Sequence, residues 1–229
     1  MTRSTTRTRL SAASLIAVLA LSGTALAACG SEDNNDNGSA NSSSTTASHD
    51  HAAQAGLQAA MRTLWIQHME WTWSTVTAFA NGSPSLQADL ERLLRNQADI
   101  GNAIEPYYGK DAAKQLTDLL TVHINQAVPV LNAAKVGDNA ALDKALEDWY
   151  GNAQDIADFL AKANPDNWPQ ATVRDMMKGH IDMTVGYASD ILGAKSQDAV
   201  KKYDEAEEHM IHLADTLTLG IIAQFPDKF

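Results

Sequence analysis

The segment MRTLWIQHMEWTWSTVTAF, residues 61–79, decides the fold class of this chain. Its core-type residues recur every three or four positions, which is the spacing of one face of an α-helix. This stripe consists of Met61, Trp65, Thr72, Val76 and Phe79. His68 falls inside the stripe. The segment therefore predicts an amphipathic helix that carries a histidine on its buried face.

The same periodicity continues to the end of the chain and is interrupted only by short stretches rich in Gly, Pro, Asn and Ser. No alternating pattern typical of a β-strand occurs between them. Helices are predicted over about 54–80, 84–106, 112–136, 140–163, 168–193 and 197–224. Short connections between long helices favour antiparallel neighbours. The prediction is an all-α fold, a single bundle of about six antiparallel helices over residues 54–229.

An internal repeat is visible in short matching segments. NQADI (96–100) matches NAQDI (152–156), and LLTVHI (119–124) matches MMKGHI (176–181). The second and third helices thus resemble the fourth and fifth. HMEWT (68–72) and HLADT (212–216) then suggest that the first and last helices form a split third copy. Such repetition predicts a pseudosymmetric bundle with matching positions in one layer.

Four histidines recur in this pattern, each four residues before a threonine or an alanine. The segments are HMEWT (68–72), HINQA (123–127), HIDMT (180–184) and HLADT (212–216). Position i+4 lies above position i on the same helix face, so a small or hydroxylic residue there leaves room for the ring or bonds it. We expect His68, His123, His180 and His212 to point inward and to share a layer.

Inward histidines on facing helices can form a metal site, because neutral imidazole is a good ligand for zinc, copper, nickel and iron. HMIH (209–212) adds His209, three residues before His212. The candidate ligands of a transition metal ion or a small ligand are therefore five histidines. Secondary candidates, which would complete or orient such a site, are Asp99, Asp155, Asn96, Asn152, Thr72, Thr184 and Thr216.

The alternative is a structural one. Buried histidines also occur as core residues that are hydrogen-bonded to a threonine or a backbone carbonyl, and duplication would copy such a feature. On this interpretation the protein is a structural or interaction protein with a buried His/Thr polar layer and no ligand. No Gly-rich phosphate loop, G-x-S-x-G or H-E-x-x-H motif is present, so the sequence names no catalytic residue and an enzyme is the least favoured class.

The N-terminal segment predicts export and lipid attachment. Residues 1–28 combine a basic start with a short apolar run, and LAAC (26–29) has the form of a lipoprotein cleavage site. Cys29, the only cysteine, would carry the lipid (palmitate among the acyl groups). Residues 29–53 would form a lipid-anchored flexible tether, because residues 30–48 contain no apolar residue larger than alanine. The expected location is the extracytoplasmic face of the cell membrane.

The charge excludes one class of partner. The chain has 17 Lys+Arg against 28 Asp+Glu, a formal net charge of −11. Nucleic acid binding requires basic side chains to meet the phosphates, so no nucleic acid partner is expected. The membrane, through the lipid on Cys29, is the one predicted partner. The sequence identifies no protein partner.

Several longer segments carry a resemblance that covers most of residues 57–229. They are LWIQHMEWT, RLLRNQADIGNAIEPYYG, LTDLLTVHI, WYGNAQDIADFLAKANPDNWP, MMKGHIDMT and ADTLTLGIIAQFPDKF. Together they resemble a family of small extracytoplasmic all-helical proteins and lipoproteins of Gram-positive bacteria. The resemblance implies a helical domain that is secreted or lipid-anchored, and it implies no particular activity.

Overall fold

The computed structural model describes residues 42–229, with side-chain surroundings from His51 onward. Within these residues there are six α-helices, one 3-10 turn and no strand, which confirms the predicted all-α bundle. The elements are α1 (Ser42–Asn81), α2 (Leu86–Tyr108), α3 (Lys110–Val136), α4 (Asn139–Ala163), α5 (Gln170–Leu192), α6 (Ser196–Gln224) and η1 (Pro226–Lys228). None of these helices combines the length and apolar character needed to cross a membrane.

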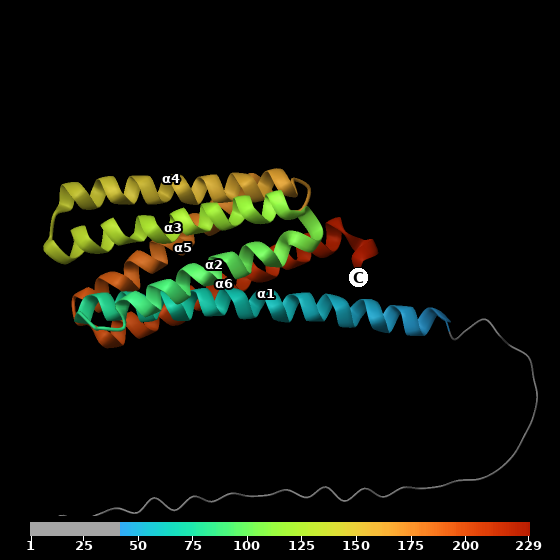
Figure 1. Ribbon diagram of the computed structural model, residues 1–229, viewed down its shortest axis with the longest axis horizontal. Helices are drawn as coiled ribbons and strands as arrows, with labels where there is room; N and C mark the ends of the chain where they lie inside the picture. The colour runs from blue at the N-terminus through green and yellow to red at the C-terminus, as the bar shows by residue number, and fades with distance from the viewer. Residues whose placement is uncertain (1–41) are drawn as a thin grey trace, which may run out of the picture. The chain divides into compact units, whose positions relative to one another are not determined.

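The first helix is longer than the sequence predicts. The expected start was near residue 54, yet α1 begins at Ser42, so residues 42–53 are helical. The first turns of α1 extend past the other helices (Figure 1), and most residues from His51 to Ala60 are exposed. A polar segment with few helix breakers can extend a helix whose later turns are held by packing. Cys29 and the signal segment lie outside the described residues.

Each helix packs against the next, and α1 packs against α6, so the helices close into a ring. Helix α5 also contacts α1 and α3. In Figure 1, α5 passes between the pair α3 and α4 and the group formed by α1, α2 and α6. The three odd-numbered helices therefore face the centre of the bundle, and side chains from all three can meet there.

Tight turns allow neighbouring helices to run antiparallel. Gly137 ends α3 in the left-handed conformation (φ 73°), which glycine adopts without strain. The next residue, Asp138, caps α4, and its carboxylate accepts a hydrogen bond from the backbone N–H of Ala141 at 3.0 Å. The chain thus reverses between α3 and α4 within two residues.

The repeat unit is a pair of consecutive helices. In all three pairs, a side chain of the even helix donates a hydrogen bond to the backbone carbonyl that lies four residues before an inward histidine. These bonds are Asn96 Nδ2 to Leu64 O (3.0 Å), Asn152 Nδ2 to Leu119 O (3.2 Å) and His209 Nε2 to Met176 O (2.8 Å). The predicted pseudosymmetry is therefore present, with α1, α3 and α5 in equivalent positions and α2, α4 and α6 in equivalent positions. These hydrogen bonds join the helices as α1–α2, α3–α4 and α5–α6. Because α6 also packs against α1, the ring is compatible with the predicted split copy of the first and last helices, but His68 matches His123 and His180 and not His212.

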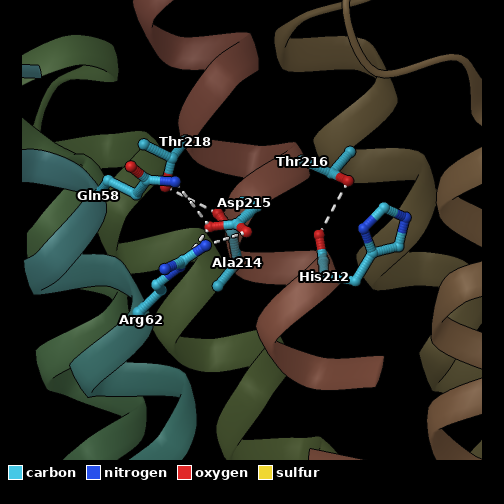
Figure 2. A network of polar contacts seen from close by, with 7 residues as sticks. All are labelled: Gln58, Arg62, His212, Ala214, Asp215, Thr216 and Thr218. Atoms are coloured by element: carbon cyan, nitrogen blue, oxygen red, sulfur yellow. Dashed lines mark hydrogen bonds and ion pairs between the residues drawn. The ribbon is translucent and has the colours of Figure 1, made fainter. Parts of the chain in front are cut away.

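An ion pair links the first and last helices of the ring. Asp215 of α6 accepts two hydrogen bonds from Arg62 of α1, each 2.6 Å long, and one from Gln58 at 3.1 Å (Figure 2). The arginine side chain is 45 % exposed, so the contact stabilises the fold only weakly in spite of its bidentate geometry. It fixes the register of α1 against α6.

Candidate functional site: a buried histidine cluster

Three of the predicted histidines meet at the centre of the bundle. His68 comes from α1, His123 from α3 and His180 from α5, and they are 2 %, 2 % and 3 % exposed. The ring centroid of His180 lies 5.4 Å from that of His68 and 5.7 Å from that of His123. His180 is thus a neighbour of both other rings. The prediction that these three residues point inward into one layer is confirmed.

The protonation of His123 follows from its partner. Nδ1 lies 2.9 Å from Oδ1 of Asn152, while Nδ2 of the same amide donates to the carbonyl of Leu119. The amide orientation is thereby fixed, so Oδ1 must accept and Nδ1 must carry the hydrogen. The lone pair of the neutral ring is on Nε2. This Nε2 is buried and has no hydrogen-bond partner.

The amide that contacts His68 presents a hydrogen-bond donor to the ring, whereas Asn152 presents an acceptor to His123. Nε2 of Gln97 lies 3.3 Å from Nδ1 of His68 and also donates to the carbonyl of Leu93 at 2.8 Å. An amide nitrogen can only donate. Nδ1 of His68 therefore accepts, and Nε2 carries the proton. The oxygen of the same amide, Oε1 of Gln97, is buried without a partner.

His180 lacks an amide partner altogether. Its Nδ1 is buried and unpaired. Where the other two pairs of helices carry Asn96 and Asn152, α6 carries His209, whose Nε2 donates to the carbonyl of Met176. Buried polar atoms without partners are rare in native proteins, because each costs roughly 1–3 kcal/mol. Two such nitrogens in one cluster point to a missing partner.

A cavity of about 50 Å³ adjoins the three rings. On this measure it has room for about three water molecules. Its wall includes Thr72, Thr75, Ala127, Trp149 and Thr184, and otherwise mainly aliphatic side chains of α1, α2, α3 and α5. No Asp, Glu, Lys or Arg lines it. Val128, which is 38 % exposed, belongs to the wall, so the cavity approaches the surface on the side of α3.

Burial keeps the cluster neutral. Loss of solvent, together with the nearby His123, lowers the pKa of His68 to about 3, against the opposing effect of its hydrogen bond to Gln97. Loss of solvent lowers the pKa of His123 to about 4, against the opposing effect of its bond to Asn152. The pKa of His180 lies well below its ordinary value for the same reason, reinforced by the other histidines. At neutral pH all three rings are therefore uncharged and each has one lone pair.

The donor atoms are not arranged as a finished metal centre. Among the side chains described, no group of three or more His, Cys, Asp or Glu is placed to hold a metal ion. The ring spacing is nevertheless close to that of imidazoles on one ion. With a metal–nitrogen distance near 2.0 Å, two tetrahedrally arranged ligand rings have centroids about 5 Å apart. This spacing is met by two ring pairs, His68 with His180 and His123 with His180.

The prediction that His212 points inward is wrong. Its side chain is exposed, and Figure 2 shows the ring turned away from the pair of Arg62 and Asp215. The buried face of α6 is formed by larger apolar residues at helical spacing, among them Met210, Leu213, Leu217 and Ile221. Position 212 lies next to Leu213 but about 100° away around the helix, which turns it toward solvent. The match between HLADT and HMEWT was a coincidence of spacing.

His209 is half-buried, between α6 and α5, and does not line the cavity. Its Nε2 is occupied by the carbonyl of Met176. A Cβ atom added at Gly179 would lie 3.2 Å from Cε1 of His209, so the ring rests in the space that this glycine leaves. His209 therefore belongs to the frame of the cluster, and its predicted role as a metal ligand has no support from this placement.

The two aspartates lie outside the cluster. Asp99 is at the surface, 3.8 Å from the guanidinium of Arg92. Asp155 is exposed and lines a groove between α3 and α4. The two asparagines, in contrast, are buried and bond into the cluster region, as described above. Asn96 and Asn152 are thus the secondary candidates that the structure brings near the histidines, and the carboxylates are too distant to complete the site.

The threonines do not bond the rings. The hydroxyl of Thr72 donates to the backbone carbonyl of His68 at 2.6 Å, and that of Thr216 to the carbonyl of His212 at 2.9 Å. Both bonds lie within one helix. Thr184 faces the cavity, and its buried hydroxyl has no partner. The residues at i+4 were expected either to leave room beside the rings or to bond them. Thr72, Ala127 and Thr184 line the cavity and so leave room. Neither Thr72 nor Thr184 has a hydrogen bond to a ring.

Two residues of the site were missed in the sequence. Gln97 follows Asn96 directly and, like it, is fully buried, although neighbouring helix positions point about 100° apart. Trp149 of α4 lies against His123, with ring centroids 5.3 Å apart. The adjacent polar pair Asn96–Gln97 in an otherwise amphipathic helix was the only available signal. This pair of residues does not indicate whether the amide of Gln97 is buried or exposed to solvent.

Comparison with known proteins adds no identification. No protein-family model, curated protein or solved structure matches this chain. The resemblance to extracytoplasmic helical proteins of Gram-positive bacteria stays a prediction.

Proposed function

We propose that this protein is an envelope-anchored lipoprotein whose bundle binds a transition-metal ion through His68, His123 and His180. The anchor rests on the sequence alone: a basic start, a short apolar run and LAAC ending at Cys29. The role we infer is storage, sensing or delivery of the ion at the extracytoplasmic face of the cell membrane. The metal site rests on the geometry of the cluster.

The observation that carries the proposal is a pair of unpartnered nitrogens in histidines that line a cavity. Nε2 of His123 and Nδ1 of His180 are both buried without hydrogen bonds. Both residues contribute to the wall of the cavity of about 50 Å³. Both rings are neutral at pH 7, because their pKa values are lowered by burial. Neutral imidazole nitrogens are good ligands for zinc, copper, nickel and iron. A metal ion would give these nitrogens the partner they lack.

The amide partners fit a ligand role for two of the three rings. Metal-bound histidines usually donate their second N–H to an oxygen acceptor, which fixes the tautomer. Asn152 already accepts the Nδ1–H of His123. For His68 to act in the same way, the amide of Gln97 must turn so that its unpartnered Oε1 accepts the proton from Nδ1. Metal binding therefore requires a rotation of Gln97.

A second function is favoured by a different observation. His68 and His123 already bond to amides, and the cavity has room for about three water molecules, which could satisfy the remaining nitrogens. On this alternative the cluster is a hydrated structural layer, and the protein acts through its surface as a structural or interaction lipoprotein.

Elemental analysis separates the two functions. The chain from Gly30 onward, produced without a tag and with His49 and His51 changed to alanine, is exposed to zinc, copper, nickel and iron and freed of loose ions. We expect about one ion per chain. The ion should be lost in His123→Leu and His180→Leu and kept in His212→Ala, because His212 is exposed and apart from the cluster. A folded, metal-free protein under all conditions would leave only the structural layer.

A further inference from the structure

The cluster offers an ion three ligands and no charge. The side chains that line the cavity are histidine, threonine, tryptophan, alanine and branched aliphatic residues. The carboxylates predicted as secondary candidates, Asp99 and Asp155, are at the surface. An ion bound here would keep its full charge inside an apolar shell.

That environment discriminates by ionic charge. The cost of moving an ion out of water rises with the square of its charge, so a divalent ion pays about four times as much as a monovalent ion of the same size. Zinc sites in proteins offset this cost with thiolate or carboxylate ligands, or by keeping a water in an open position. No thiolate or carboxylate lines this cavity, so the compensation left to a divalent ion is a water held inside the cavity, whose wall is mostly apolar.

The number of ligands points the same way. The bundle delivers one imidazole from each of α1, α3 and α5, and His180 is a neighbour of both other rings. Structural zinc sites are almost always four-coordinate. A cuprous ion carries a single charge and is satisfied by two or three ligands, so it needs no fourth one from the wall of the cavity.

We propose that the histidine cluster is selective for a cuprous ion over divalent zinc and copper. This inference rests on the proposed function, because it presupposes that the three imidazoles bind a metal. It assigns the selectivity to the neutral, apolar wall of the cavity and not to the imidazoles, which serve all these metals.

The test is an anaerobic competition with the same tag-free chain from Gly30 onward. A preformed complex of cuprous ion with bicinchoninate is titrated with protein, and zinc and cupric affinities are measured against chromophoric chelators of known strength. We expect one cuprous ion per chain, bound at least a hundredfold more tightly than zinc or cupric ion. His180→Leu should abolish this binding, and His212→Ala should leave it unchanged.

A charge-changing variant tests the cause of the selectivity. Gln97→Glu places a carboxylate beside Nδ1 of His68, where the amide now lies at 3.3 Å. The added negative charge should shift the ratio of cuprous to zinc affinity toward zinc by about tenfold or more, the usual size of effects from residues behind a ligand. Gln115→Glu, in the surface groove between α3 and α4, is the control and should not change the ratio.

Each outcome decides something. Zinc or cupric ion bound as tightly as cuprous ion through the same histidines overturns this inference and leaves the proposed metal site intact. The wild-type competition alone gives this answer, even if a histidine variant fails to fold. Absence of binding for every metal, or cuprous binding that survives in both His123→Leu and His180→Leu, removes the metal site and this inference together.

Discussion

Nδ1 of His123 donates a hydrogen bond to Oδ1 of Asn152 across 2.9 Å, and this bond decides which nitrogen of the buried ring carries the proton. The amide can play this part because its Nδ2 is held by the carbonyl of Leu119 at 3.2 Å. Asn152 on α4 therefore bonds both the ring of His123 and the backbone carbonyl of Leu119 on α3. Because Nδ1 of His123 carries the proton, the lone pair of the ring is on Nε2. The bond links the packing of two helices to the chemistry of the cluster.

Asn152→Leu should destabilise the protein by about 2–4 kcal/mol. The substitution keeps the volume roughly constant but leaves the Nδ1–H of His123 and the carbonyl of Leu119 with one partner fewer, and each buried group costs about 1–3 kcal/mol when unpaired. Denaturant unfolding followed by circular dichroism measures the loss. Asn102→Leu on the exposed side of α2 is the control and should change stability by less than about 0.5 kcal/mol. Equal effects at the two positions would show that the bond contributes nothing.

The metal-free protein should lose stability as the pH falls from about 6.5 to about 4. Burial lowers the pKa of His123 to about 4 and that of His68 to about 3, whereas the unfolded chain titrates near 6.5. Below pH 6.5 the unfolded state binds protons that the folded state does not, so acid favours unfolding until the folded pKa is passed. For His123 alone the total is about 3 kcal/mol. Unfolding free energies measured with chelator present, between pH 7.5 and 4.5, give the slope.

Two variants locate the origin of this slope. His123→Gln should remove about one proton from the difference between the unfolded and folded states over this window, which flattens the curve. His212→Gln should leave the slope close to that of the wild type, because His212 is exposed. The carboxylates whose pKa values are lowered by ion pairs, such as Asp215 and Asp158, act mainly below this window. A wild-type curve that is flat between pH 6.5 and 4.5 would contradict buried neutral histidines.

The fold class and the three converging histidines could be predicted from the sequence because both depend on periodicity. Spacings of three and four residues place His68, His123 and His180 on the apolar faces of their helices, and burial follows. The failure at His212 has the same origin. The orientation of α6 is decided by its buried apolar residues, such as Met210, Leu213 and Leu217, and these place His212 on the exposed side. A five-residue match to HMEWT carries no information about that orientation.

The pairing of side chains between helices could not be predicted. Whether Gln97 reaches a histidine depends on the rotation and axial offset of α2 against α1, which periodicity leaves undetermined. The start of α1 was missed for a different reason. Residues 42–53 have no apolar stripe, so nothing in their pattern distinguishes a helix extended from residue 54 from a flexible tether.

Gly101→Ala should destabilise the bundle, although alanine is the better helix former. A Cβ atom at this position would lie 2.7 Å from the backbone carbonyl of Ala113 and 2.0 Å from Oγ1 of Thr117, so α2 and α3 would have to separate. Overpacking of this kind costs about 1–3 kcal/mol. Gly151→Ala on α4 is the matched control, because nothing lies within 4 Å of the added atom. It should raise stability by up to about 1 kcal/mol. Thermal unfolding of both variants checks the opposite signs.

The pair of Arg62 and Asp215 should have a measurable coupling energy that exceeds that of an ion pair within one helix. The contact is bidentate, but the arginine is 45 % exposed, so water and salt screen it. A double-mutant cycle with Arg62→Ala and Asp215→Ala measures the coupling, which should shrink in 1 M salt. The comparison pair, Lys114 with Asp118, lies within α3, and its cycle should give about 0.3–0.5 kcal/mol. A coupling no larger than that of Lys114 with Asp118 would mean that the pair does not help to close the ring.

The third helix pair, α5–α6, differs from the other two in carrying His209 in place of an asparagine. We expect the stability effects of substitutions at Gly179 and His209 to be coupled. Where α4 carries Asn152, the matching position of α6 carries the larger His209, whose Cε1 would lie 3.2 Å from a Cβ atom added at Gly179. In the wild type, Gly179→Ala gains helix propensity of about 1 kcal/mol but presses on the ring, so the net gain should be small or negative. In His209→Asn the ring is gone, and the same substitution should give the full gain. The difference between the two backgrounds, about 0.5–1 kcal/mol in chemical unfolding, measures the coupling. Equal effects of Gly179→Ala in both backgrounds would mean that the glycine does not make room for His209.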